Sequence, residues 1–527
     1  MIKSLRVKFT LYPFLFGIYP VLALIAHNTA EMNLTDGLRA LIGSIILTLV
    51  LYVILLVMVN NPTKSALLTS FFLLLFYSYG QLNILSRSWT IFNLPLGRHR
   101  TLIPLYIIIF AVITWFILKT KRDLSGSTRF LNAFGIILLI FPLYQFAAYQ
   151  IEDYQAQQKQ EQALTKSYLV SLTNDQPPPD VYYIVADGYP RSDFISQYLG
   201  SSNTEFLESL ENRGFFVAHC SQSNYSDTRF SLASTLNMAY LDGGEDLPQV
   251  VYPGSTLDSM IRSGNVQQNF SDLGYTIVTF ESGYKWLRWE ESDLHLAPAQ
   301  ERSSPFLNIG FNGFEQLLLD TTAVKLLFDL PFILNPVQKD RLAEIVNNPR
   351  ASHRERVLYA LEKLPVIPEE IPGPKFVYAH IIFPHPPFVV DADGNPLQNS
   401  PPDELSAYAN QINYLDRRLL EIVDNLIEKS DPDPVIVIQG DHGATIEYQD
   451  LGIDPSNHLG ILNVYYLPAN LIDLKTPHES LYPTITPVNT FRVIFDRYFN
   501  GEYGLLDDRS IVGRQSPYTY LECAQPE

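Results

Sequence analysis

Residues 180–188 contain the stretch that decides the fold: Asp180-Val181-Tyr182-Tyr183-Ile184-Val185-Ala186-Asp187-Gly188. Its centre, Val181–Ala186, is a short and almost uninterrupted apolar run, which is typical of a strand buried on both faces of a parallel sheet. Three similar runs follow at Tyr275–Phe280, Phe376–Ile382 and Val435–Gln439, separated by segments long enough for helices such as Asp416–Glu428. This alternation predicts an α/β sandwich with a mainly parallel sheet.

Polar residues follow three of these four runs at the point where each run ends. Asp187 follows the first, His380 and His385 surround the end of the third, and the triplet Asp441-His442-Gly443 follows the fourth. In such folds the chemistry gathers beyond the carboxyl ends of the strands. Carboxylates and a neutral imidazole suit a divalent cation. A single Asp after a strand is usually a helix cap, but together these residues predict a site for one divalent metal ion, Mn²⁺, Zn²⁺ or Mg²⁺.

A hydroxyl-rich segment offers a nucleophile for such a site. Residues 223–234 include Ser226, Thr228 and Ser231 and lead into a predicted helix. A hydroxyl at a helix start lies at the positive end of the helix dipole, and a nearby cation would further favour its alkoxide. An ordinary serine-rich helix cap explains the same pattern. Position alone does not choose among the three hydroxyls.

The distribution of charge separates an N-terminal part from the rest. Of the 527 residues, 47% are hydrophobic and 17% charged, so the chain can bury a sizeable core and is not intrinsically disordered. Up to Gln150 there are 12 Lys and Arg against 3 Asp and Glu, a net charge of +9, whereas the remainder has 25 against 52, a net charge of −27. This acidic balance excludes nucleic-acid binding for the C-terminal part.

The N-terminal part contains apolar runs of the length that crosses a bilayer. Five spans are predicted, at Phe9–Ala26, Leu38–Val59, Ala66–Leu82, Leu102–Leu118 and Phe130–Ala148. The first could be mistaken for a signal peptide, but it lacks a convincing small-residue cleavage site and four more spans follow. The spans contain almost no ionisable residues, which argues against a transport path.

The basic residues beside the spans predict the orientation. With the N-terminus in the cytoplasm, eight of them lie on the cytoplasmic side and three outside: Lys3, Arg6, Lys8, Lys64, Lys119, Lys121, Arg122 and Arg129 against Arg87, Arg98 and Arg100. By the positive-inside rule this bias favours a cytoplasmic N-terminus. An odd number of spans then makes everything after Ala148 extracytoplasmic, so we expect a multi-pass cell-membrane protein with an extracytoplasmic C-terminal domain.

These features divide the chain into three parts. We expect a transmembrane domain at residues 1–149, an amphipathic connector with a Pro-rich linker at 150–179, and a catalytic domain at 180–527. The prolines at 177–179 stop any helix before the last part. The only cysteines, Cys220 and Cys523, give no disulfide framework. They could pair outside the membrane, but we expect them to be unrelated, since one lies close to the predicted site and the other in the C-terminal tail.

Together these motifs resemble the alkaline phosphatase superfamily. The pattern comprises Asp187 after a strand, Thr228-x-x-Ser231 opening a helix, His380 and His385 with Pro386, and Asp441-His442-Gly443. More narrowly, it resembles the sulfatase-like branch with lipoteichoic acid synthases and lipid A phosphoethanolamine transferases, which are similar in having five spans before an extracytoplasmic catalytic domain. The resemblance covers nearly the whole chain and implies an alkaline phosphatase-like fold, although its specific motifs occupy only a few dozen residues.

The resemblance implies a role for each matching residue. Thr228 would be the nucleophile and would bind the metal together with Asp187, Asp441 and His442, while His385 would contact the substrate phosphate. As a proton donor, His385 would act on a phosphoryl oxygen or on the leaving alcohol. Three further residues are candidates for substrate binding: His380, His458 and Arg229. His380 could equally be a core histidine, and Arg229 an exposed helix arginine.

Three departures qualify the resemblance. The stretch Thr228–Leu232 lacks both the Cys and the Pro of the Cys/Ser-x-Pro-x-Arg motif, so formylglycine-dependent sulfatase activity is not expected. No further Asp-x-x-x-His set for a second metal lies near His380–His385. The position of Asp187 is a Glu in the lipoteichoic acid and phosphoethanolamine enzymes, which leaves the transferred group open.

The sequence therefore predicts a membrane-anchored, metal-dependent phosphotransferase. It would move a phospho head group from a membrane lipid donor to an envelope lipid or glycan through a phospho-threonine intermediate. Two alternatives stay open: a metal-dependent phosphodiesterase or sulfatase-like hydrolase of the same fold, and a non-catalytic scaffold that binds an envelope polymer. The apparently complete ligand set disfavours the scaffold, but the sequence shows no acceptor site.

Overall fold

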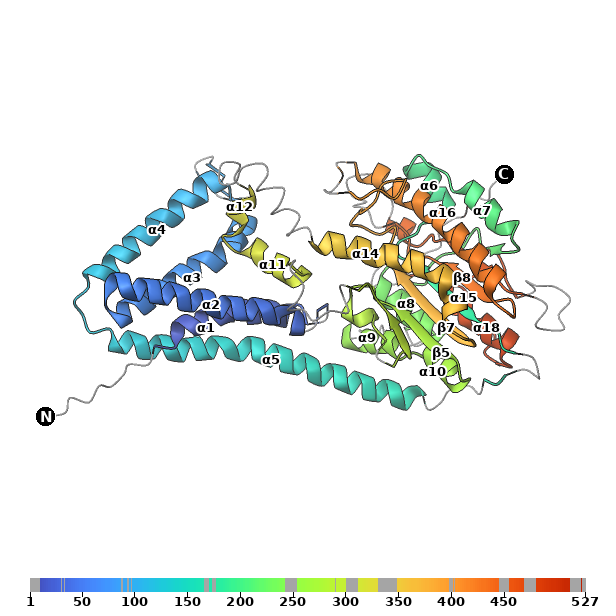
Figure 1. Ribbon diagram of the computed structural model, residues 1–527, viewed down its shortest axis with the longest axis horizontal. Helices are drawn as coiled ribbons and strands as arrows, with labels where there is room; N and C mark the ends of the chain where they lie inside the picture. Colours follow the sequence, from blue (N-terminus) through green and yellow to red (C-terminus); the bar gives the residue numbers. More distant parts are fainter. Residues whose placement is uncertain are drawn as a thin grey trace. The chain divides into compact units, whose positions relative to one another are not determined.

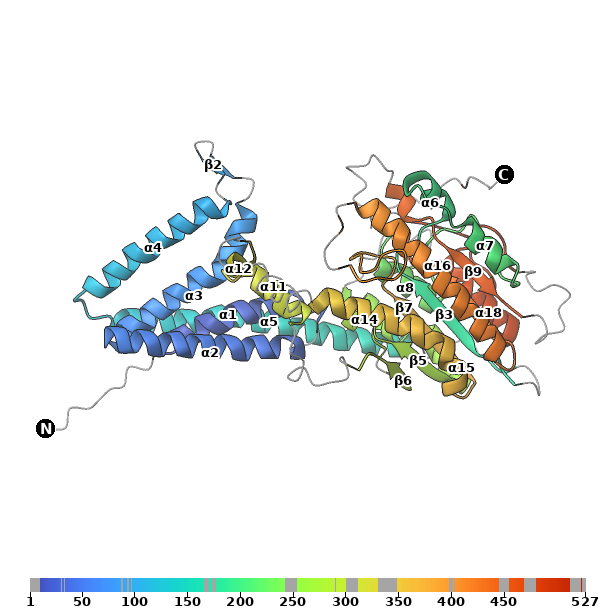
Figure 2. The same ribbon diagram turned by 45° about the horizontal axis from the view of Figure 1, so that its top comes forward.

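The computed structural model divides the chain into two compact units, shown as ribbons in Figures 1 and 2. It describes residues 10–29, 31–32, 34–86, 89–91, 94–95, 97–164, 170–172, 177–241, 254–289, 291–299, 311–329, 348–397, 401, 403–444, 455–468, 480–511 and 523. Met1–Ile151 and Ser303–Pro349 form the first unit, and Glu152–Arg302 and Arg350–Glu527 the second.

The first unit is built from apolar helices. Its elements are α1 (Tyr12–His27), α2 (Leu34–Val59), α3 (Pro62–Leu85), the two-residue strands β1 (Thr90–Ile91) and β2 (Leu94–Pro95), α4 (His99–Lys119), the first part of α5 (Ser125–Leu164), α11 (Gly313–Thr321) and α12 (Lys325–Asp329). Helices α2 to α5 are long and apolar enough to cross a membrane, whereas α1 has 16 residues. The predicted apolar helical part is confirmed. The crossing of α1, a helix about 24 Å long at 1.5 Å per residue, remains a prediction, and the basic residues Lys3, Arg6, Lys8 and Arg87 lie outside the described residues.

A segment from the middle of the chain packs within this first unit. Phe314 and Leu318 of α11 form a small core with Val21 and Ile25 of α1, and Glu315 accepts a hydrogen bond of 2.6 Å from Nε of Arg39 on α2. The sequence gives no sign of this return, because α11 is a short helix inside the stretch assigned to the catalytic domain. The predicted division at residues 149 and 179 stays a prediction.

The second unit is organised around a seven-stranded sheet with the order β4-β9-β8-β3-β7-β5-β6. Its strands are β3 (Val181–Ala186), β4 (Phe216–Val217), β5 (Thr276–Phe280), β6 (Leu294–Leu296), β7 (Lys375–Ile381), β8 (Val435–Gln439) and β9 (Asn463–Tyr466). β3 pairs in parallel with β7 and β8, and β5 with β6 and β7, while β9 runs antiparallel to β8 and β4. The mainly parallel sheet is thus confirmed, and all four predicted strands are present within one residue at each end.

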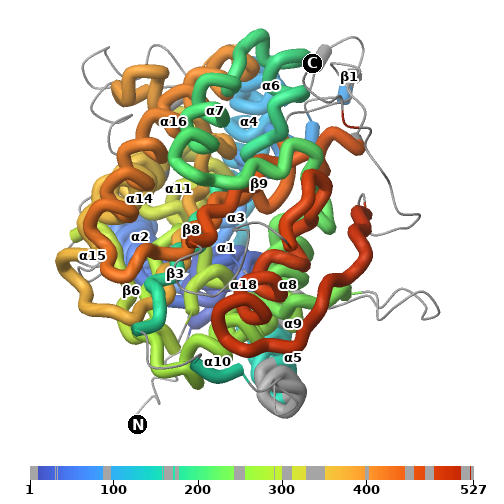
Figure 3. The backbone as a smooth tube through the Cα atoms, turned by 90° about the vertical axis from the view of Figure 1, so that its right-hand side faces the viewer, coloured from blue at the N-terminus to red at the C-terminus, as the bar shows by residue number. Residues whose placement is uncertain are grey.

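Helices cover both faces of the sheet and make two cores (Figure 3). One face carries α6 (Ser192–Tyr198), α7 (Thr204–Glu211), α14 (Asn348–Lys363), α15 (Ile367–Glu370) and α16 (Glu404–Lys429), and the other carries α8 (Thr228–Asn237), α9 (Gly254–Arg262), α10 (Asn265–Asp272) and α18 (Thr490–Tyr498). Four 3₁₀ turns complete the described elements, at Lys285–Leu287, Leu364–Val366, Pro455–His458 and Pro487–Asn489. Side chains of β3 alternate between the two cores, so the apolar run that opened the analysis is buried on both faces.

The first part of the predicted connector, up to Leu164, is a continuation of α5. This helix runs without a break from Ser125 to Leu164. On its C-terminal part, Asp153 accepts a hydrogen bond of 2.6 Å from Nη2 of Arg262 at the end of α9, and both residues are buried. The connector is therefore fixed to the fold of the second unit by a buried ion pair.

The prediction that the two cysteines are unrelated was wrong. Cys220 and Cys523 form a disulfide, with their Cα atoms 5.3 Å apart. Cys220 follows β4 at the edge of the sheet, and the tail returns to this edge after a sequence separation of 303 residues. The sequence did not predict this proximity, because the two cysteines are far apart along the chain.

Candidate active site

Three adjacent central strands, β8, β3 and β7, bring the predicted polar clusters to one edge of the sheet. Main-chain hydrogen bonds then connect the segments that follow β3 and β7. The Asp187 N–H donates to the carbonyl of Ile381 (3.0 Å), and the His385 N–H donates to the carbonyl of Asp187 (3.1 Å). The N–H of Gly188, which has a positive φ of 71°, donates to Oδ1 of Asp441 at 3.0 Å. The neighbouring strand ends thus hold both carboxylates in place.

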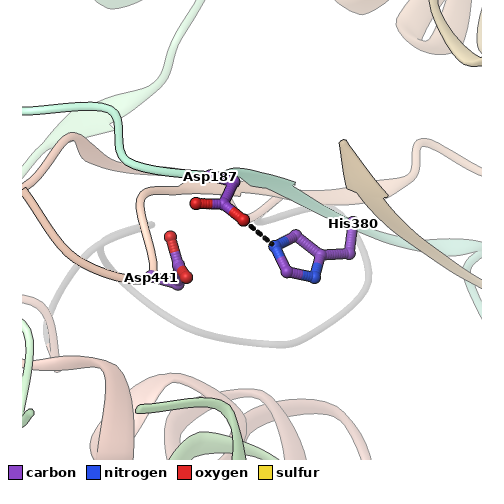
Figure 4. Close-up of side chains that lie close together, drawn as sticks. All are labelled: Asp187, His380 and Asp441. Carbon is purple, nitrogen blue, oxygen red and sulfur yellow. Dashed lines mark ion pairs between the residues drawn. The ribbon is translucent and has the colours of Figure 1, made fainter. Parts of the chain in front are cut away.

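Asp187, His380 and Asp441 form a buried cluster that could hold a metal ion (Figure 4). One possible ligand atom from each lies within 4.8 Å of the others. His380 Nε2 is 3.2 Å from Asp187 Oδ2, an ion-pair contact. Among the described residues, Oδ1 of Asp187 and Oδ2 of Asp441 are buried without a hydrogen-bond partner.

These unpaired atoms test whether the site suits a cation. Leaving a buried carboxylate oxygen without a partner costs about 1–3 kcal/mol or more, and two such oxygens converge here with an imidazole nitrogen. Oxygen and nitrogen donors of this kind are those that Zn²⁺ and Mn²⁺ accept. The residues present therefore fit a divalent cation.

His442 and the predicted nucleophile Thr228 lie against this cluster. His442 Nε2 is 3.6 Å from Asp187 Oδ1 and 3.5 Å from Asp441 Oδ2. It is also 3.0 Å from Oγ1 of Thr228, the first residue of α8. His442 Nδ1 lies 2.8 Å from the carbonyl of Gly443, so we assign the proton to Nδ1, which leaves Nε2 as the acceptor for the Thr228 hydroxyl.

Two further predicted histidines flank His442. The ring centroids of His385 and His442 are 6.2 Å apart, and those of His442 and His458 are 6.1 Å apart. Nδ1 of His385 donates to the carbonyl of Pro386 at 2.5 Å. This bond orients the ring and leaves Nε2 available to a substrate oxygen.

The close packing of these charges shifts several pKa values. Burial alone would raise the pKa of Asp187, but the charges of His385, His380 and His442 lower it well below its ordinary range. Burial would lower the pKa of His442, yet the neighbouring Asp441 and Asp187 raise it. Burial, together with His442 and His385, lowers the pKa of His458 to about 4. The site therefore keeps the Asp187 carboxylate ionised and His458 neutral near pH 7.

Arg229 is the one predicted site residue that the fold directs elsewhere. Its Nε donates to Oδ1 of the buried Asp258 at 3.0 Å, and its guanidinium carbon lies 4.6 Å from the ring centroid of Trp286. These contacts fix Arg229 between α8, α9 and the turn at Lys285–Leu287.

Sequence reasoning missed one histidine beside the site. His353 on α14 is only 7% exposed, and it interacts electrostatically with Asp187 and His385. Burial, together with the charges of Arg356, His385 and Arg350, lowers the pKa of His353 to about 3. No motif marks it, because it lies within a helix and does not follow the end of a strand. Its basic neighbours Arg350, Arg354 and Arg356 were the available signal.

Comparison with known families decides the classification. Residues 179–491, more than half of the chain, match the sulfatase family. The chain belongs to the sulfatase family. It is accordingly a sulfatase-like enzyme, and the family predicted from the motifs is confirmed. No curated protein matches the sequence significantly.

Several solved structures are similar to this sulfatase-family chain at low sequence identity. The C-terminal periplasmic domain of EptC from Escherichia coli, in complex with Zn, has 12% identity and a TM-score of 0.39, covering 63% of this chain and 85% of that one. Lipooligosaccharide phosphoethanolamine transferase A from Neisseria meningitidis, an integral membrane protein, has 12% identity and a TM-score of 0.38, covering 94% and 95%. Lipoteichoic acid synthase LtaP from Listeria monocytogenes has 17% identity and a TM-score of 0.33, covering 58% and 70%. At these values none of them assigns a role to a residue of this chain.

Proposed function

We propose that this sulfatase-family protein is a membrane-anchored phosphotransferase that uses one divalent cation and Thr228 as its nucleophile. It takes a phospho head group from a membrane lipid and passes it to an envelope lipid or glycan. The observation that carries the proposal is the contact of 3.0 Å between Thr228 Oγ1 and His442 Nε2, beside two buried carboxylates with unpaired oxygens. The absence of the Cys/Ser-x-Pro-x-Arg motif at Thr228–Leu232 argues against formylglycine chemistry.

Each residue of the cluster has a defined task in this reaction. Asp187, Asp441, His442 and Thr228 would hold the cation, with His380 in reach of the same point. When bound, the cation neutralises charge on the phosphoryl oxygens, the main demand of phosphoryl transfer. His442 Nε2 would be the ligand atom, because Nδ1 faces the Gly443 carbonyl. The Thr228 proton would therefore pass to solvent, and the positive end of α8 would favour the negative charge left on Oγ1.

The transfer then proceeds by two displacements at phosphorus. Oγ1 of Thr228 attacks the phosphodiester, a bond forms between Oγ1 and phosphorus, and the bond between phosphorus and the lipid oxygen breaks. His385 protonates this leaving oxygen, so that the lipid departs as an alcohol. A hydroxyl of the acceptor next gives its proton to His385 and attacks phosphorus, the bond between phosphorus and Oγ1 breaks, and Oγ1 leaves with its negative charge, which restores the starting state. His458 and His380 are proposed as phosphate contacts, whereas Arg229 would reach the phosphate only by leaving Asp258.

The location of the catalytic unit is part of this proposal. We propose that it is extracytoplasmic, as the basic residues beside the spans predict. Two features support this side of the membrane. Cys220 and Cys523 form a disulfide, which persists in oxidising compartments. In addition, α11 contacts the C-terminal end of α1 through Ile25 and the N-terminal end of α2 through Arg39. If α1 spans the membrane from a cytoplasmic N-terminus, both of these helix ends are extracytoplasmic.

Metal analysis combined with mass spectrometry of Thr228 tests the proposal. The full chain, purified in detergent, is analysed for Mn, Zn and Mg and then incubated with total membrane lipid. We expect about one metal ion per chain, loss of this ion in Asp441→Ala, and a head-group phosphate on Thr228 that is absent in Thr228→Ala. A folded chain with no metal and an unmodified Thr228 would overturn the enzymatic proposal. Release of the head group to water, even with a membrane acceptor present, would replace transfer with hydrolysis.

A further inference from the structure

A small cavity lies beside His380. Its polar lining comes from three elements: Glu281 and Ser282 after β5, His353 and Arg356 on α14, and His380 on β7. The apolar side chains of Val357, Ala360, Ile381 and Ile382 close the rest. One wall of the cavity is thus a residue of the candidate metal cluster, and the opposite wall is a histidine to which no role has been assigned.

Two histidines that line this cavity each have a buried imidazole nitrogen with no hydrogen-bond partner among the residues that the structure describes. These nitrogens are Nδ1 of His380 and Nε2 of His353, on residues that are 4% and 7% exposed. Each unpaired buried polar atom costs about 1–3 kcal/mol, so two that face the same polar cavity indicate a shared partner. A single water molecule is suited to this position, because buried waters typically bridge polar groups of this kind.

The direction of the bridge follows from the chemistry of His380. If Nε2 of His380 presents its lone pair to a cation between Asp187 and Asp441, its proton must be on Nδ1, and Nδ1 is then a donor. Nε2 of His353 must consequently be the acceptor at the other end. The guanidinium of Arg356 lines the same cavity and disfavours a second positive charge on His353. His380, His353 and Arg356 are therefore all compatible with a bridge in which Nδ1 of His380 donates and Nε2 of His353 accepts.

We propose that His353 is a positioning residue for the metal site: through one bridging water it accepts the proton of His380 Nδ1 and thereby keeps Nε2 of His380 free as a metal ligand. This inference rests on the proposed metal-dependent function. It adds α14 to the elements that build the site, and it gives His380 a role as ligand in place of the predicted role in substrate binding.

The local packing explains how α14 is held in register for this task. Oε1 of Glu281 accepts a hydrogen bond from the Gly283 N–H at 2.7 Å. The guanidinium carbon of Arg356 lies so close to Gly283 that a Cβ there would be 2.6 Å from it. Gly283 also has a positive φ of 94°. A glycine is therefore required where α14 approaches the loop after β5, and this close approach brings His353 to the cavity.

Metal affinity measured without substrate tests the inference. The full chain in detergent is stripped with chelator and titrated with Zn²⁺ and with Mn²⁺ by calorimetry. Relative to the unchanged chain, His353→Leu should bind about 10- to 100-fold more weakly, the usual cost of losing an outer partner of a ligand. His353→Gln should retain most of the affinity, since its amide oxygen can accept a hydrogen bond near the position of Nε2. Val357→Ala, in the same helix and cavity, is the matched control for packing and should bind like the unchanged chain.

The possible outcomes separate this inference from the proposed function. If the unchanged chain binds metal and His353→Leu binds it equally well, the positioning role is wrong while the proposed function stands. If His353→Gln binds as weakly as His353→Leu, or Val357→Ala also loses affinity, packing rather than the acceptor is responsible and the inference fails. If the folded, unchanged chain binds neither metal, the proposed function fails and this inference with it.

Discussion

Among single residues, the three hydroxyls at the start of α8 show how the fold separates candidates that share a sequence pattern. Oγ1 of Thr228 lies 3.0 Å from His442 Nε2, at the edge of the buried cluster. Ser231 is buried, and its Oγ donates to the carbonyl of Asp441 at 2.6 Å. The main-chain N–H of Ser226 donates to Ile511 at 3.3 Å. The Thr228 hydroxyl thus contacts a side chain of the proposed metal site, whereas the Ser231 hydroxyl donates to a main-chain carbonyl of that site.

Substitution of these hydroxyls should give opposite results. Thr228→Ala should abolish head-group transfer, by at least about 10³-fold, since the loss of a nucleophile removes most of the rate enhancement. Ser231→Ala should keep most activity and lower the free energy of unfolding by about 1 kcal/mol, the typical worth of one hydrogen bond. Transfer rates and thermal melts of the full chain check both. Wild-type activity in Thr228→Ala would assign the nucleophile to another residue.

Asp416 on α16 is a buried acid outside the site whose titration should appear in stability. It accepts a hydrogen bond of 2.7 Å from Tyr189, and burial raises its pKa from 3.8 to about 8. The folded state therefore holds a proton that the unfolded state loses, and this contribution to stability is lost as pH rises from about 4 to about 8, by at most about 1.4 kcal/mol per pH unit.

Asp416→Asn keeps a side-chain acceptor for Tyr189 and cannot ionise. We expect its stability relative to the unchanged chain to increase between pH 5 and pH 8, measured by thermal unfolding. Asp424→Asn on the same helix is the control. Arg213 lowers the pKa of Asp424, so its effect should not change between these pH values. A pH-independent effect of Asp416→Asn would show that Asp416 is ionised throughout.

The residues of the site were predictable to the extent that they end strands. Asp187, Asp441 and His442 follow buried apolar runs, and parallel strands place such ends together. His353 follows no such rule, since a helix residue can face any of several neighbours. The partners of Arg229 were hidden for a related reason: Asp258 and Trp286 lie 29 and 57 residues away along the chain, and nothing in the sequence pairs them with Arg229.

Among the helices and strands, burial determined which ones could be predicted from the sequence. Central strands β3, β5, β7 and β8 are continuous apolar runs, and each was predicted. The strands that were missed, β4, β6 and β9, have two to four residues and lie toward the two ends of the sheet order, where short mixed sequences suffice. Helix α11 was missed because its apolar residues pack on α1 instead of on the sheet.

The ion pair between Arg39 and Glu315 should stabilise the attachment of α11 to α2. Glu315 is buried and also accepts a hydrogen bond from the Asn312 N–H, as part of a capping box. Arg39→Met would leave the Glu315 carboxylate unpaired and should lower the stability of the first unit by about 1–3 kcal/mol. The double variant with Glu315→Gln should recover most of this loss, because Gln keeps an oxygen for the cap. Thermal melts in detergent compare the stability of the unchanged chain, Arg39→Met and the double variant. An unchanged melting temperature for Arg39→Met would contradict the stabilising role of the ion pair.

For the whole molecule, the disulfide joins two parts of the second unit that are far apart in the sequence. Because it closes a loop across 303 residues, it restricts the unfolded chain strongly. Cys523→Ser should lower the free energy of unfolding by about 2–4 kcal/mol, measured by unfolding with and without reductant. Thiol counting by mass spectrometry should find no free cysteine in the unreduced chain. Two free thiols in freshly purified protein would refute the pairing.

The same disulfide makes the orientation of the whole chain testable. Because both native cysteines are joined, a single introduced cysteine is the only thiol available to a reagent. Lys121→Cys lies between α4 and α5, and Glu428→Cys lies near the end of α16, where both native side chains are exposed. A membrane-impermeant maleimide applied to intact spheroplasts should label Glu428→Cys at once and Lys121→Cys only after permeabilisation. The expectation follows from the eight basic residues placed inside against three outside and from an odd number of crossings. The reverse pattern would place the catalytic unit in the cytoplasm, where a disulfide would not persist and where envelope acceptors on the outer surface could not reach Thr228.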